Sequence, residues 1–114
     1  MNTTAAQQGP VTIVTVEGSI DSLNAEQLTQ AFAQHLEQGR RQLVADLGAV
    51  PYTSTAGLRA LLAAVKDSRR LGGDLRLAAA QPGVERVLSL SGFTGIIKTY
   101  REVAEAVGSF GSGG

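Results

Sequence analysis

The chain has 114 residues, 43% of them hydrophobic and 18% charged, a balance typical of one globular domain and not of a disordered segment. Its formal net charge is zero, which argues against a nucleic-acid partner and against attachment to a membrane through a basic face. The chain has no cysteine, which excludes disulfides, thiolate metal sites and a thiol nucleophile. It has no signal-peptide pattern at residues 1–10 and no apolar run long enough to span a membrane, so we expect a cytoplasmic protein.

The first half of the chain predicts strands on either side of one helix. Residues 1–9 are small and polar and are expected to be a flexible end. The β-branched run at 11–16 predicts a strand, and 19–21 a short second strand that pairs with it like a hairpin. Apolar spacing over 23–36 predicts an amphipathic helix, with Asn24 as N-cap, Gln27 completing a capping box and Gly39 ending it. A buried strand is expected at 42–47.

The second half continues the alternation. Residues 55–71 predict a helix with a core-facing stripe of Leu58, Leu61, Leu62 and Val65. Further strands are expected at 74–79 and 96–100, a helix from Pro82 to residue 90, and a terminal helix starting at 102–107. Helices between strands imply parallel crossovers. The prediction is a single α/β domain over 10–108, with a mixed sheet of four or five strands, about four helices, and a flexible tail at 109–114.

Three consecutive hydroxyl residues, Thr53, Ser54 and Thr55, precede this second helix. Capping explains one of them, because a Ser or Thr oxygen satisfies a free N–H of the first helical turn. If Ser54 is the cap, the Thr55 hydroxyl is free on the first turn, and Gly57 has no side chain to shield it. A helix N-terminus favours negative charge, so the fold would tolerate a phosphate on Thr55, which adds about two charges to the surface. From the residues alone, both the capping and the switch interpretations remain open.

Three segments in order resemble the STAS family of bacterial anti-sigma factor antagonists: GSIDSLNAEQL (18–28), DLGAVPYTSTAGLRALL (46–62) and GGDLRLAAAQPGVERVLSLSGF (72–93). The resemblance implies the STAS fold and a phosphoacceptor two residues before the glycine, which is Thr55, with Ser54 as the alternative. Ser54 stands where the family often has Asp, and Ala56 where it often has Ser. The implied partner-binding residues are Asp21, Ser54, Thr55, Gly57 and Arg59, and the resemblance places Asp21 and Asp46 near the phosphorylation site.

The resemblance implies a binding module without catalysis, metal or cofactor. It would bind an anti-sigma factor that is also a serine/threonine kinase, leave it when phosphorylated, and be reset by a phosphatase, with no nucleic-acid or membrane partner. An alternative is a STAS regulatory subunit of a lipid-transport ATPase or a stress-signalling scaffold. A receiver domain or small enzyme is disfavoured, because no acidic pair follows the first strand. Asp21 and Asp46 are better explained as turn-capping or surface residues than as metal ligands, and lone His35 as a structural or surface residue.

Overall fold

The computed structural model describes residues 1–111 of the protein. In chain order its elements are β1 (Asn2–Gln8), β2 (Val11–Glu17), α1 (Ala25–Glu37), β3 (Gln42–Ala49), α2 (Thr55–Arg70), β4 (Asp74–Ala78), α3 (Pro82–Leu90), the 3-10 turn η1 (Phe93–Gly95), β5 (Thr99–Tyr100) and α4 (Val103–Gly111).

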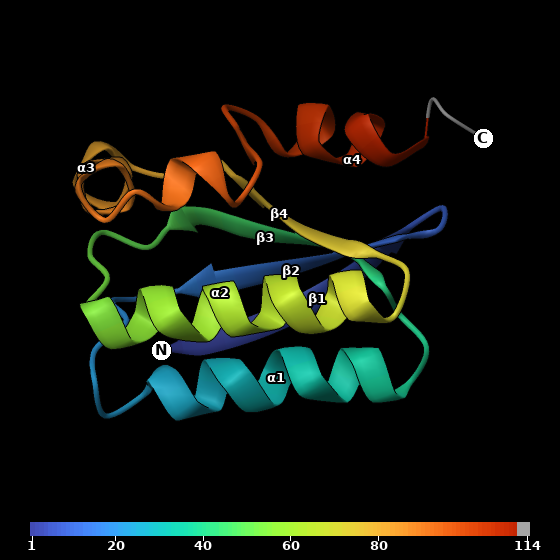
Figure 1. The fold of residues 1–114 in the computed structure, drawn as a ribbon, viewed down its shortest axis with the longest axis horizontal. Coiled ribbons are helices and arrows are strands. Elements are labelled where there is room, and N and C mark those ends of the chain that lie inside the picture. Colours follow the sequence, from blue (N-terminus) through green and yellow to red (C-terminus); the bar gives the residue numbers. More distant parts are fainter. Residues whose placement is uncertain (112–114) are drawn as a thin grey trace.

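The five strands form one mixed sheet in the order β1-β2-β3-β4-β5. β1 pairs antiparallel with β2, and every other neighbouring pair is parallel. Helices α1 and α2 lie side by side under one face of the sheet, and α4 lies over the other (Figure 1). The prediction of an α/β fold with a mixed sheet and four helices is therefore confirmed.

Strand alternation divides the core between the two faces of the sheet. In β3, Leu43, Ala45 and Leu47 pack with the main cluster under α1 and α2, whereas Val44 packs with a smaller cluster under α4. The predicted stripe of α2 faces the main cluster. Leu58, Leu61 and Val65 are fully buried, and Leu62 packs half-buried at the margin.

The prediction of a flexible end over residues 1–9 is wrong, because Asn2–Gln8 forms β1. Gly9 and Pro10 make a two-residue turn in which Gly9 has a φ of 60°, so the strand folds back on β2 as a hairpin. Because β1 is an edge strand with nearly every residue exposed, its sequence carries no alternation of polar and apolar residues.

Three smaller expectations are corrected at strand and helix ends. Residues 19–21 do not pair back on β2; Ile20 forms an isolated parallel bridge with Thr53. The last strand, expected over 96–100, is shorter, because only Thr99–Tyr100 pair with β4; the 3-10 turn at 93–95 precedes it. The expected tail over 109–114 overlaps α4, which runs to Gly111, while residues 112–114 lie outside the described residues.

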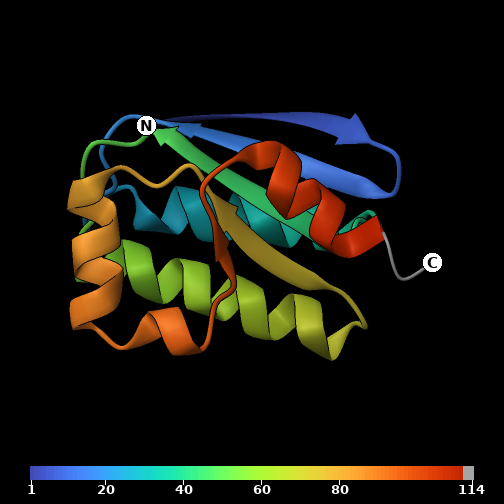
Figure 2. The same ribbon diagram turned by 90° about the horizontal axis from the view of Figure 1, so that it is seen from above.

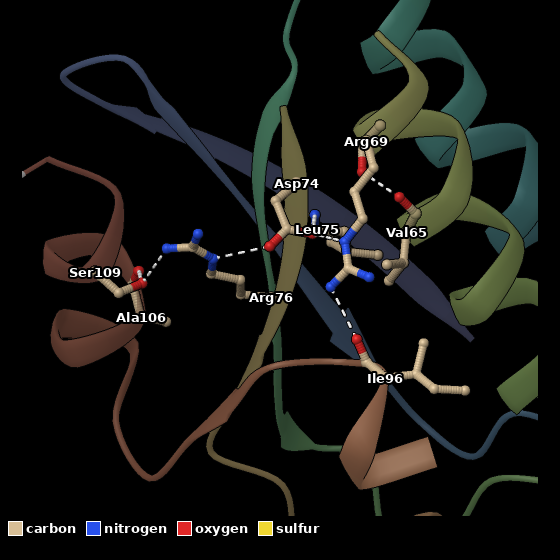
Figure 3. A network of polar contacts seen from close by, with 9 residues as sticks. Val65, Arg69, Asp74, Leu75, Arg76, Ile96, Ala106 and Ser109 are labelled. Atoms are coloured by element: carbon tan, nitrogen blue, oxygen red, sulfur yellow. Dashed lines mark hydrogen bonds and ion pairs between the residues drawn. The ribbon is translucent and has the colours of Figure 1, made fainter. Parts of the chain in front are cut away.

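An acidic residue joins three elements at the far end of α2. Asp74 is 7% exposed and accepts hydrogen bonds from Arg69 Nε at 2.8 Å and from Arg76 Nε at 3.0 Å. Arg76 also donates to Ser109 Oγ at 2.7 Å, and its guanidinium lies 3.9 Å from the centre of the Phe110 ring. Figure 3 shows Asp74 between the two arginines, which connect β4 to α2 on one side and to α4 on the other.

Candidate partner-binding site

The chain segments that follow β2 and β3 run side by side beyond the ends of the strands. Gly18 N donates to Ala49 O at 2.9 Å, Ile20 N to Tyr52 O at 3.0 Å, and Ser54 N to Ile20 O at 2.8 Å. These bonds place the turn containing Asp21 next to the start of α2. Two of the predicted site segments, far apart in sequence, are thus brought together by backbone hydrogen bonds.

The three hydroxyls occupy three different environments. Thr53 is buried, and its Oγ1 donates to Ser54 O at 3.2 Å. Ser54 is the N-cap of α2, and its Oγ accepts from Gly57 N at 3.2 Å. Thr55 is the first residue of the helix and is exposed, and no hydrogen bond among residues 1–111 involves its hydroxyl. The cap is therefore Ser54, and Thr55 is the hydroxyl left free.

Gly57 does not leave open space on the first turn of α2, contrary to expectation, because it is buried. A Cβ on Gly57 would lie 2.3 Å from Thr53 Oγ1 and 2.7 Å from Ile20 Cγ2. These distances are too short for real contacts, so the glycine is required for α2 to approach the bridge between Ile20 and Thr53. Its place in the site is to position the exposed residues, not to form part of an open surface.

Asp21 and Asn24 hold the turn that leads into α1. Asp21 Oδ1 accepts from Leu23 N at 2.9 Å and from Asn24 N at 2.8 Å, and Asn24 Oδ1 accepts from Asp21 N at 2.9 Å. Asn24 occupies the N-cap position but makes no side-chain cap bond, so the predicted capping box with Gln27 does not form. The turn-capping interpretation of Asp21 is confirmed, and the residue remains exposed beside the start of α2.

Asp46 is not brought to the start of α2. It pairs with Thr15 and Ala78 in the sheet, and strand alternation puts its side chain on the α4 face, opposite α2. Its Oδ1 accepts from Gly48 N at 3.0 Å. Within residues 1–111, no group of three or more His, Cys, Asp or Glu side chains could hold a metal ion.

His35 lies outside this region, in the last turn of α1. Its Nδ1 is 3.1 Å from Arg40 Nη1. Partial burial lowers the pKa of His35 from 6.5, and the positive charge of Arg40 lowers it further. This environment favours the neutral imidazole.

A groove of about 360 Å³ lies between the N-terminal halves of α1 and α2. Alanine side chains from both helices line much of it, and Glu26 from α1 and Arg59 from α2 contribute the charged groups. Arg59 is exposed and sits four residues after Thr55, on the same side of the helix. The first turn of α2 contains no acidic residue of its own, and the carboxylate beside it is that of Asp21.

Sequence reasoning missed two exposed apolar side chains at this end of the molecule. Leu23 is 89% exposed in the turn before α1, and Tyr52 is 53% exposed just before the hydroxyl run. The helix predicted over 23–36 includes Leu23, whereas the structure places it in the turn before α1. An aromatic residue in a short loop beside a candidate switch was the available signal, since tyrosine is enriched at binding hot spots.

The model of the STAS domain matches residues 2–106. The chain belongs to the STAS-domain family. The protein BtrV of Bordetella bronchiseptica, described as a candidate anti-sigma factor antagonist, is 40% identical over 96 residues, which are 82% of this chain and 83% of BtrV.

Solved structures agree with this assignment. An anti-sigma factor antagonist from Mycobacterium paratuberculosis has a TM-score of 0.86 and 27% identity, covering 95% of this chain and 92% of that one. SpoIIAA of Bacillus in its phosphorylated form shares the fold at a TM-score of 0.73 and 15% identity, covering 96% and 99% of the two chains. The resemblance seen in the sequence is therefore confirmed. Among residues 1–111, no helix is both long and apolar enough to cross a membrane.

Proposed function

We propose that this STAS protein is an anti-sigma factor antagonist that binds an anti-sigma factor with serine/threonine kinase activity, and that phosphorylation of Thr55 releases it. The observation that carries the proposal is the exposed Thr55 hydroxyl at the start of α2, next to the Ser54 side chain that already caps the helix. The cycle takes place in the cytoplasm, frees a sigma factor for transcription, and is reset by a phosphatase. It requires no cofactor and no chemistry from the domain itself.

The partner contacts the switch surface, defined here as Asp21, Leu23, Tyr52, Thr55 and Arg59. Backbone bonds between the Ile20 and Tyr52 segments support its continuity, and all five side chains are exposed. Leu23 and Tyr52 offer apolar area that is otherwise left in water. Protein interfaces usually combine an apolar core with a polar rim, and tyrosine and arginine, here Tyr52 and Arg59, are enriched at their hot spots.

A phosphate on Thr55 changes this surface without disturbing the fold. The free N–H groups at the helix N-terminus stabilise a dianion there. Arg59 lies four residues on, within reach of an i,i+4 pair, so phosphorylation would withdraw its positive charge from any partner carboxylate. The affinity for the anti-sigma factor falls for two reasons. Binding must remove water from the phosphate, and Arg59 is no longer available to pair with a carboxylate of the partner.

Ser54 is the less suitable acceptor. Its Oγ accepts the hydrogen bond from Gly57 N, and an ester on that oxygen would place the phosphate at the capping contact itself. Modifying Ser54 would therefore alter the start of α2, whereas modifying Thr55 leaves the cap in place.

The experiment combines the protein with the anti-sigma factor co-purified from the native host. We expect Thr55→Glu to fold normally and to bind at least about tenfold more weakly, a loss of about 1.4 kcal/mol. Thr94→Glu, which adds the same charge at an exposed threonine in η1, is the matched control and should bind normally. Thr55→Ala should bind and resist phosphorylation, whereas Ser54→Ala should still be phosphorylated.

The phosphorylated residue is identified by mass spectrometry after incubation with the kinase and ATP. Phosphate on Ser54 with Thr55 unmodified would contradict the assignment. No phosphate on either residue, with an active cognate kinase present, would favour a STAS subunit that regulates another assembly without a switch.

A further inference from the structure

The β1 edge of the sheet is open. β1 is the outermost strand, and no other element of residues 1–111 lies beyond it (Figure 2). All of its seven residues are exposed except Thr3, which is half-buried. The opposite edge is different, because β5 has only two residues and lies beside α4. One long edge is therefore available for pairing.

The hairpin register determines which backbone groups of β1 face outward. The pair that closes a two-residue turn, here Gln8 and Val11, is hydrogen-bonded, and bonded and non-bonded pairs alternate along the ladder. The pairs containing Thr3, Ala5 and Gln7 are then the non-bonded ones. Their N–H and C=O groups point away from β2, towards the open side.

β1 lacks the features that usually protect an edge strand. Its sequence, NTTAAQQ, contains no charged residue and no proline. Lysine, proline or a bulge on an edge normally prevents pairing with another chain. The zero net charge of the whole chain adds no long-range repulsion between two copies.

We propose that β1 is a dimer interface, at which it pairs antiparallel with β1 of a second copy of this chain around a two-fold axis at Ala5. In that register Ala5 faces Ala5 of the second copy and Thr3 faces Gln7. All three outward-facing residues fall in hydrogen-bonded positions, giving about six inter-chain bonds. The non-bonded pairs join Asn2 to Gln8 and Thr4 to Ala6, which are small or uncharged, so no like charges meet.

A two-fold interface closes on itself, which makes the product a dimer and not a fibre. The two five-stranded sheets become one continuous sheet. No residue of the switch surface belongs to β1, so the dimer displays two copies of that surface. The interface is independent of the proposed switch, and either can fail without the other.

The test measures mass in solution by sedimentation and light scattering over a wide range of protein concentration. The wild-type chain should reach twice the 11.8 kDa monomer mass. Ala5→Lys places two ammonium groups opposite each other and should raise the dimer dissociation constant at least about tenfold. Ala104→Lys, at an exposed alanine of α4, is the matched control and should dimerise as the wild type does.

Two more variants separate loss of pairing from loss of folding. Ala5→Pro removes an N–H that β2 does not use, so the monomer should fold with unchanged circular dichroism while the dimer is lost. Ala5→Cys, in a chain without other cysteines, should be joined across the two-fold axis by a short bis-maleimide, and Ala104→Cys should not. A wild type that stays monomeric, a dimer that persists in Ala5→Lys, or equal cross-linking of the two cysteine variants would overturn the proposal.

Discussion

Gly57→Ala tests whether the start of α2 packs closely against the bridge between Ile20 and Thr53. The new Cβ would lie 2.3 Å from Thr53 Oγ1 and 2.7 Å from Ile20 Cγ2. Both neighbours are buried, at 1% and 0% exposure, and both are β-branched with restricted rotamers. Backbone hydrogen bonds hold their segments together, so the first turn of α2 must move instead.

Two opposing effects determine the expected magnitude. Replacing a helical glycine by alanine gains about 1 kcal/mol of helix propensity. Overpacking a buried contact typically costs about 1 to 3 kcal/mol, and the distances here require the upper part of that range. We therefore expect Gly57→Ala to lower the free energy of unfolding by roughly 1 to 2 kcal/mol.

Urea denaturation measures this change, and Gly108→Ala is its matched control. Gly108 lies in α4, where a Cβ would meet no atom within 4 Å, so the propensity gain acts alone and that variant should be slightly more stable. The m-value of both variants should equal that of the wild type. If Gly57→Ala proved as stable as Gly108→Ala, the close contact among Gly57, Thr53 and Ile20 would not exist as described.

Three further predictions concern the core, the ion pairs of Asp74 with Arg69 and Arg76, and the dependence of stability on pH. Leu61→Ala, at a fully buried position of α2, should cost about 2 to 5 kcal/mol by the same urea measurement, and a loss below about 1 kcal/mol would contradict its burial. Asp74→Asn should lower the free energy of unfolding by roughly 2 to 4 kcal/mol, because the Arg76 side chain, which is 12% exposed, loses its counter-charge. The control Asp67→Asn breaks only an exposed pair with Arg70 and should lower it by less than about 0.5 kcal/mol. The folded state lowers the pKa of His35 below 6.5, so it binds the proton more weakly than the unfolded chain; stability should be lost as pH falls from 6.5 through the lowered pKa. His35→Gln should reduce that loss in thermal melts, and an unchanged pH profile would assign the loss to other groups.

Helices with one buried face were predictable, because apolar residues then recur every three or four positions in the sequence. The stripe of Leu58, Leu61 and Val65 faces the core as its spacing indicated. β1 was not predictable in this way, because an edge strand is held by backbone bonds and exposes both faces. Its only local signal was the Gly9-Pro10 turn, which is informative only when a hairpin is already being considered.

The candidate site was also predictable only where it depends on residues close together in the sequence. The Ser54 cap and the free Thr55 hydroxyl follow from local helix chemistry, which depends on residues a few positions apart. The burial of Gly57 depends on Ile20, which approaches through a bridge between segments more than 30 positions apart in the chain. The orientation of Asp46 depends on the strand register, since a shift of one residue would put its side chain on the other face.

The order of the three hydroxyls determines which one the fold allows to change. Thr53 is buried against the bridge to Ile20, so added charge there would have to be desolvated in the core. Ser54 supplies the capping oxygen, so its modification would act on the helix before it acted on a partner. Thr55 shares the favourable field of the helix N-terminus with Ser54, but its hydroxyl makes no hydrogen bond among the described residues. A charge added to Thr55 is therefore expressed at the surface, where its free energy can alter binding while folding is left unchanged.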